Sequence, residues 1–207
     1  MAYTIPSTAE EFPPSLEWAQ VDLNRVPHLP VPPPGPQSKL HHERCTRYFK
    51  GLSSQVKLFP VAFERGSGGA AQDVDGNSYI DFSSGIYVTT LGHCHPKISE
   101  AVARAAGQLM NAHDFTTPIK MRLMEKLAQV LPGDLNGFQL YDSGTTAVEA
   151  GIRVLRAATG RHETLSCFSD YHGKTYGAVS LGHIRSQVYG AVRGPGAHML
   201  PRPDTYR

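Results

Sequence analysis

A chain of 207 residues allows one domain or one and a half, and its 40% hydrophobic residues suffice for a sizeable core. A formal net charge of +2 and the lack of any long Lys/Arg block argue against a nucleic-acid partner. No apolar run approaches the roughly 20 residues that span a membrane, and the first twelve residues lack the features of a secretory signal.

The cysteines predict a reducing compartment. Cys45, Cys94 and Cys167 are an odd number and form no paired framework, which indicates free thiols and a cytoplasmic protein. His93 and His95 flank Cys94, but adjacent residues of an extended loop point in different directions. No second ligand pair follows at zinc spacing, so we predict no metal site.

Residues 1–36 hold nine of the sixteen prolines. This density disfavours helix and favours extended or polyproline backbone, so we expect a leader that is disordered or runs along the surface. A proline-rich ligand for a partner domain is the alternative. A helix is predicted next, over residues 37–50.

The following stretch has the signals of a β-hairpin. Residues 61–63 and 79–82 have strand patterns, and Asp75-Gly76 is a hairpin turn signal. Residues 66–69 are glycine-rich, yet no helical pattern follows them. We therefore expect a loop before the hairpin there and not a phosphate cradle.

Helices and strands then alternate. Helices are predicted over residues 98–109, 118–130 and about 146–159, and strands over residues 138–141 and 164–168. Strand, helix and strand at this spacing imply a parallel pair joined by a right-handed crossover. The order predicts an α/β protein, with a small leading domain before an α/β domain that has a partly parallel sheet.

The turn at residues 142–146, with the sequence DSGTT, lies between a predicted strand and a predicted helix. Free amides and the helix dipole at such a turn suit a phosphate dianion, with Gly144 allowing close approach and the hydroxyls of Ser143, Thr145 and Thr146 adding donors. The alternative is an ordinary N-cap at Ser143 or Thr145, with Glu149 as a first-turn acid.

A second turn follows the strand at 164–168 and contains Tyr171. Both turns would lie at the carboxyl edge of one sheet, where ligands bind, so Tyr171 is expected near the phosphate and able to stack on a flat ring. A phosphate and a flat ring together indicate pyridoxal phosphate (PLP) or a nucleotide.

Three motifs in order carry a family resemblance. They are DVDGNSYIDFSSGIYVTTLGHCHP at residues 73–96, SGTTAVE at 143–149 and YHGKT at 171–175. From about Gly35 to Arg207 the chain resembles class III PLP-dependent aminotransferases, most closely the 4-aminobutyrate aminotransferase branch. The resemblance implies fold type I. It implies a leader at 1–36, the N-terminal segment of the small domain with its hairpin at 37–95, and the first half of the large PLP-binding α/β domain at 96–207.

The resemblance also implies site residues and partners. Ser143, Gly144 and Thr145 bind the cofactor phosphate, Tyr171 stacks on the pyridine ring and His172 lies beside it. Ile86 and Tyr87 line the substrate site of a homodimer. The alternatives are a core aromatic at Tyr171, a satisfied loop histidine at His172 and plain core at Ile86.

Lys174 stands where the relatives often have an arginine that clamps a carboxylate, and diamine-accepting members have lysine there. This leaves ω-amino acids and diamines open as amino donors, with a 2-oxo acid as acceptor. No lysine follows Lys174, so the chain is expected to be an N-terminal half that lacks the Schiff-base lysine, pairs with a C-terminal half and is inactive alone. Two alternatives are a non-catalytic phosphate- or PLP-binding protein, and a PLP-dependent decarboxylase or aminomutase.

Overall fold

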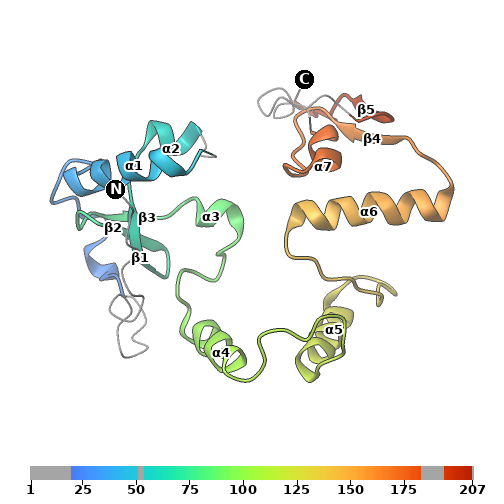
Figure 1. Ribbon diagram of the computed structural model, residues 1–207, viewed down its shortest axis with the longest axis horizontal. Helices are drawn as coiled ribbons and strands as arrows, with labels where there is room; N and C mark the ends of the chain where they lie inside the picture. Colours follow the sequence, from blue (N-terminus) through green and yellow to red (C-terminus); the bar gives the residue numbers. More distant parts are fainter. Residues whose placement is uncertain (1–19, 51–53, 183–193, 207) are drawn as a thin grey trace. The chain divides into compact units, whose positions relative to one another are not determined.

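The computed structural model describes residues 20–50, 54–182 and 194–206 (Figure 1). Its contacts divide the chain into a first unit, Met1–Phe115, and a second unit, Thr116–Arg207. Residues 1–19 of the expected leader lie outside the described residues. In the described part no helix has the length and apolar character that crossing a membrane requires.

The first unit is built on a three-stranded antiparallel sheet in the order β1-β2-β3. Its strands are β1 (Phe63–Ser67), β2 (Ala70–Asp73) and β3 (Ser78–Ile80), and its helices are η2 (Leu23–Arg25), α1 (Pro36–Tyr48), α2 (Ser54–Leu58), α3 (Ser84–Tyr87) and α4 (Pro96–Ala106). Strands β2 and β3 pair from Ala70↔Ile80 to Gln72↔Ser78, which confirms the turn at Asp75-Gly76. The expected loop at 66–69 is wrong in part, because Gly66 and Ser67 pair with β2 as the end of β1.

A buried carboxylate organises this hairpin. The Oδ1 atom of Asp73 accepts from the amides of Asp75 and Asn77 at 2.9 and 2.8 Å, and its Oδ2 atom accepts from the Tyr79 hydroxyl at 2.7 Å. Burial and the Asp73 carboxylate raise the pKa of Tyr79, so the phenol stays protonated and donates. The turn is thereby held by side chains as well as by strand pairing.

Two further segments attach to the hairpin. The Asp75 carboxylate accepts from the amides of Gln37 and Ser38, both at 2.8 Å, and so caps the N-terminus of α1. In the leader, the backbone of His28 exchanges hydrogen bonds of 3.0 and 2.7 Å with Ser78 of β3. The leader is thus attached to strand β3, and the N-terminus of helix α1 is attached to the β2–β3 turn.

The second unit contains one parallel strand pair. Its elements are α5 (Pro118–Val130), α6 (Gly144–Thr159), β4 (Thr164–Cys167), α7 (Tyr176–Ser180) and β5 (Ala197–Leu200). Strand β4 pairs with β5 in parallel from Thr164↔Ala197 to Cys167↔Leu200, and Figure 1 shows the two side by side. The α/β class is confirmed.

The helices predicted from the sequence are confirmed, with ends shifted by a few residues. Helix α6 begins at Gly144, two residues before the expected start. It ends at Thr159, and the following Gly160 has a φ of 67°, the left-handed cap expected of glycine there. Helix α4 ends at Ala106, before the expected Leu109.

The strand predicted at 138–141 is wrong. These residues carry no strand pairing with any described segment, and the second unit's sheet contains only β4 and β5. The predicted parallel pair of 138–141 with 164–168 is therefore also wrong, and β4 pairs with β5 instead. The turns before α6 and after β4 are brought together in another way, through helix α7.

Candidate functional site

The 142–146 turn begins helix α6 with a capping box. The Ser143 hydroxyl accepts from the Thr146 amide at 3.4 Å, and the Thr146 hydroxyl accepts from the Ser143 amide at 3.2 Å. Thr146 also donates to Asp142 at 2.7 Å. The N-cap expected at Ser143 is confirmed, and it rigidifies the turn.

Capping leaves two donors open. In the described part of the chain no group accepts from the amides of Gly144 and Thr145. A Cβ placed on Gly144 would meet no atom within 4 Å, so the backbone there faces open space. Two such amides at the positive end of a sixteen-residue helix have the charge and direction that suit an anion.

Five of the expected site residues line one pocket. It has a volume of about 480 Å³, and we call it the Thr145 pocket; its lining residues are Gly144, Thr145, Val148, Tyr171, His172, Gly173 and Lys174. Gly173 allows the loop before α7 to approach Thr145 closely. Its φ is 134°, and a Cβ there would press into the Thr145 side chain. Ser143 lies one residue outside this lining, where it caps α6.

Glu149 links the two segments that line the pocket, because it lies on α6 and binds the segment that begins α7. Its Oε1 atom accepts from the Thr175 hydroxyl at 2.6 Å and from the amides of Gly177 and Ala178 at 2.8 and 3.0 Å. It therefore caps α7 from α6. The hydrogen bond from Thr175, followed by those from the amides of Ala178 and Gly177, lowers the pKa of Glu149 and keeps it ionised.

This role was not predicted. Glu149 was expected to be a first-turn acid of its own helix, and that expectation is wrong, because the first turn of α6 has no acidic residue. The available signal was a carboxylate on the first turns of α6 together with the unsatisfied N-terminus of a second short helix.

The hydrogen-bond direction at Thr145 follows from Glu149. An ionised carboxylate only accepts, so the Thr175 hydroxyl donates to Glu149 and has no second proton. The Thr145 hydroxyl, 2.8 Å from the Thr175 hydroxyl, must then donate to Thr175, and it accepts from the Thr175 amide at 3.4 Å. Its own amide, and not its hydroxyl, is the donor left for a ligand.

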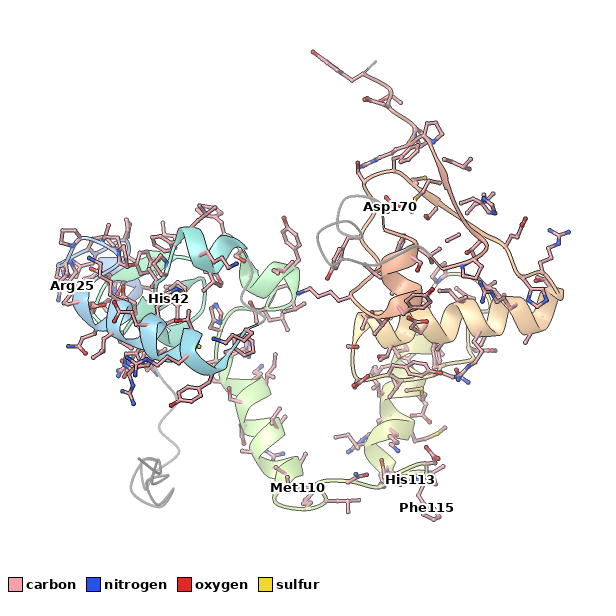
Figure 2. All side chains as sticks on the ribbon, turned by 45° about the horizontal axis from the view of Figure 1, so that its top comes forward. Arg25, His42, Met110, His113, Phe115 and Asp170 are labelled. Carbon is pink, nitrogen blue, oxygen red and sulfur yellow. The ribbon has the colours of Figure 1, made fainter. Side chains whose placement is uncertain are left out.

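Tyr171 and His172 present an aromatic and a polar group to the pocket. Tyr171 is 57% exposed, so it is available for stacking and is not a core aromatic. The Nε2 atom of His172 is buried without a hydrogen-bond partner among the described residues. Asp170, labelled in Figure 2, lies in the loop after β4 with its Oδ2 atom 3.7 Å from that nitrogen, beyond hydrogen-bonding distance.

Ile86 and Tyr87 belong to the first unit, whereas the Thr145 pocket belongs to the second. Both residues have left-handed backbone, with φ of 63° and 68°. Their side chains are 69% and 80% exposed, so Ile86 is not plain core within its unit.

The described residues contain no group of three His, Cys, Asp or Glu side chains placed to hold a metal ion. Cys94 is exposed and free, as is Cys45, and the free Cys167 is half-buried.

Comparison with known proteins gives the family. A family model described as aminotransferase class-III matches residues 52–206. The chain is 36% identical to the diaminobutyrate–2-oxoglutarate aminotransferase of Rhizobium meliloti over 80% of this chain and 37% of that protein. It is 35% identical to the alanine/serine racemase of Pyrococcus horikoshii over 95% of this chain and 41% of that protein.

Two further matches agree. The chain is 33% identical to the 4-aminobutyrate aminotransferase of Mycobacterium bovis over 84% of this chain and 38% of that protein. A solved (S)-enantioselective omega-transaminase from Thermomicrobium roseum superposes with a TM-score of 0.72 at 26% identity, over 82% of this chain and 41% of that one. The chain thus spans about two fifths of the relatives' length. It belongs to the class III aminotransferase family.

Proposed function

We propose that this chain binds the phosphate and ring of PLP in an aminotransferase that moves an amino group from an ω-amino acid or diamine to a 2-oxo acid. The observation that carries the proposal is the Thr145 pocket, which combines two open helix-terminal amides with an exposed tyrosine and an unpartnered buried histidine nitrogen. This donor set fits a phosphorylated heteroaromatic ring. When bound, PLP supplies a reactive carbonyl and a ring that withdraws electrons.

The chain's own residues would each perform one task. The amides of Gly144 and Thr145 bind the phosphate with the dipole of α6, and Ser143 holds their turn in place. Tyr171 stacks on the ring, and the His172 nitrogen hydrogen-bonds to a polar group of the cofactor.

Substrate groups are assigned to three other residues. Lys174 offers a single mobile positive charge to a carboxylate, where arginine would offer a bidentate fork. Ile86 and Tyr87 line the substrate site. The relatives named for diaminobutyrate and 4-aminobutyrate support donors with an amino group far from the carboxylate. We further propose that the protein is a homodimer. We also propose that it resides in a reducing cytoplasm, and the free cysteines support this second proposal.

The racemase relative, matched over 95% of this chain, favours amino-acid racemisation as a second candidate. The two reactions differ in their second substrate. Transamination of 4-aminobutyrate or 2,4-diaminobutyrate requires a 2-oxo acid such as 2-oxoglutarate. Racemisation inverts the chirality of alanine or serine without any acceptor, so assays of the chain paired with its C-terminal half, with and without 2-oxoglutarate, separate them.

Phosphate binding is tested by substituting Gly144. The Gly144→Val variant is expected to bind PLP about 10- to 100-fold more weakly, because the branched side chain would occupy the open space before the two amides and displace a charge-assisted hydrogen bond. Spectroscopic PLP titration measures the loss.

Thr145→Ser is the matched control for this variant. Serine keeps both the amide and the hydroxyl that donates to Thr175, so its affinity should stay within about threefold of the wild type. Equal PLP affinity of the Val and Ser variants, with both folded, would count against phosphate binding at this turn.

Ring stacking is tested at Tyr171. The Tyr171→Ala variant should lose about 0.5–1.5 kcal/mol of PLP binding, the contribution of an aromatic pair beyond simple burial. Tyr171→Phe should keep most of it, because the ring remains. If the Phe variant binds PLP as poorly as the Ala variant, a hydroxyl contact is responsible in place of stacking.

A further inference from the structure

The segment that carries Ile86 and Tyr87 has an unusual backbone. Four consecutive residues, Ser84 to Tyr87, have φ between 49° and 68°, and only one of them is glycine. This segment is α3, and because of its backbone we call it the left-handed turn. Left-handed backbone is costly for side chains with a Cβ, above all for a β-branched residue such as Ile86. Such a conformation persists only where the surrounding structure holds it.

One carboxylate holds the start of the left-handed turn. The Oδ1 atom of Asp81 accepts from the amides of Ser83 and Ser84 at 2.8 and 2.9 Å. The Ser84 hydroxyl lies 3.1 Å from the Thr89 hydroxyl, which closes the turn at its other end. Asp81 itself is tied to the hairpin, because its amide donates to the Gly69 carbonyl at 2.9 Å.

A histidine braces that carboxylate. The Nε2 atom of His93 lies 2.7 Å from the Oδ2 atom of Asp81, and both side chains are largely buried. The backbone of His93 exchanges hydrogen bonds of 3.0 and 2.8 Å with Gly68. The imidazole packs so closely on β1 that a Cβ at Gly66 would lie 2.9 Å from its Cγ atom. Hairpin, histidine and carboxylate therefore form a continuous support beneath the turn.

We propose that Asp81 and His93 are positioning residues that fix the left-handed turn, and with it the direction in which the exposed side chains of Ile86 and Tyr87 meet the substrate. The substrate-facing role of these two side chains rests on the proposed function; the Asp81–His93 clamp does not.

Charge contributes to the clamp. The hydrogen bond from His93, assisted by the amides of Ser84 and Ser83, holds the pKa of the Asp81 carboxyl below its ordinary value of 3.8. A pocket of about 350 Å³ adjoins the clamp, and its titratable lining groups are Asp81 and His93 themselves. Since the folded-state pKa is lowered, the clamp is complete above pH 3.8 and weakens as the pH falls below that value.

The test follows the turn by NMR in the full chain. In Asp81→Ala, hydrogen-exchange protection of the Ser83 and Ser84 amides should fall about tenfold or more, and the Ile86 methyl resonances should move toward their positions in unstructured peptides. Asp81→Asn keeps one carbonyl oxygen for the two amides, so its protection should lie between that of the wild type and that of the alanine variant. Asp114→Asn, an exposed aspartate of the same unit, is the matched control and should change nothing at Ile86.

Two outcomes would overturn the clamp. One is an Asp81→Ala variant that is folded, by its dispersed spectrum, yet keeps wild-type protection and Ile86 resonances. The other is identical behaviour of the Ala and Asn variants. If Asp81→Ala does not fold, acid titration of the wild type decides: Ile86 should shift only below pH 3.8 and together with the Asp81 carboxyl, and an Ile86 that does not move while that carboxyl titrates overturns the proposal.

Parallel PLP titration separates this inference from the proposed function. If PLP binds normally and the Ile86 resonances do not change in the Asp81 variants, the clamp is refuted and the proposed function stands. If PLP does not bind but the Ile86 resonances change in the Asp81 variants, the proposed function is refuted and the clamp stands. The methyl resonances of Ile152 on α6 report whether the second unit is unaffected by changes in the first.

Discussion

Gly173→Ala is expected to destabilise the second unit by about 2–4 kcal/mol and to abolish the Thr145 pocket. Two costs combine. Left-handed backbone at φ 134° is unfavourable for alanine, and the new Cβ would lie 3.0 Å from the Thr145 Cα atom and closer still to its side chain. Denaturant unfolding followed by circular dichroism gives the free-energy difference, and PLP titration of the folded variant shows whether the pocket survives.

Gly151→Ala is the control for that experiment. Gly151 lies inside α6, and a Cβ there would meet no atom within 4 Å. Alanine at this position should stabilise the helix by about 0.5–1 kcal/mol, because glycine loses more backbone freedom on folding. Similar effects of the two substitutions would show that the close approach of Gly173 to Thr145 contributes nothing.

Glu149→Ala is the second substitution with a large expected effect. It removes the acceptor for three donors and with it the cap of α7, which should cost about 1–2 kcal/mol of unfolding free energy. The Thr175 hydroxyl then becomes free to accept or donate elsewhere, so the orientation of the Thr145 hydroxyl is lost as well. PLP affinity should fall although Glu149 does not line the Thr145 pocket.

Glu149→Gln isolates the contribution of charge. Its amide oxygen can still accept, so it should be more stable than the alanine variant. The lowered pKa means that the native carboxylate stabilises the fold above the ordinary value of 4.5, and that this contribution disappears as the pH falls below it. The difference between wild type and Glu149→Gln should therefore be constant above about pH 5 and should shrink as the pH falls below 4.5. A difference independent of pH would show that the charge of Glu149 does not contribute to the cap of α7.

Local signals predicted the four longest helices among the described residues, α1, α4, α5 and α6, and the turn that begins α6. Pro118 and the residues after Val130 gave both ends of α5, and Gly160 marked the end of α6, because proline at a helix start and glycine at its end act within a few residues. The SGTT turn was recognised for the same reason. The strand at 138–141 was wrong because a strand needs a partner, and an apolar run does not show whether one is present.

Long-range features escaped the sequence analysis. The hydrogen bonds of Glu149 cross 26 to 29 residues, and no spacing rule links a carboxylate on one helix to the N-terminus of another at such a separation. The left-handed turn was hidden for the opposite reason: Ile86 and Tyr87 have side chains that disfavour it, so their sequence indicates ordinary strand or helix. The Glu149 cap and the left-handed turn could be recognised only from the hydrogen bonds that hold them in the structure.

The Asp75 cap has a consequence for how the chain folds. Helix α1 has no side-chain cap from its own Gly35, and its acceptor comes from a residue 38 positions later in the sequence. An isolated helix of thirteen residues is marginal in water, so α1 should fray until the β2–β3 turn has formed. During synthesis the helix leaves the ribosome before its cap does, and its lasting formation must wait for the hairpin. The first unit should therefore fold from its turn outward, with its N-terminal helix joining late.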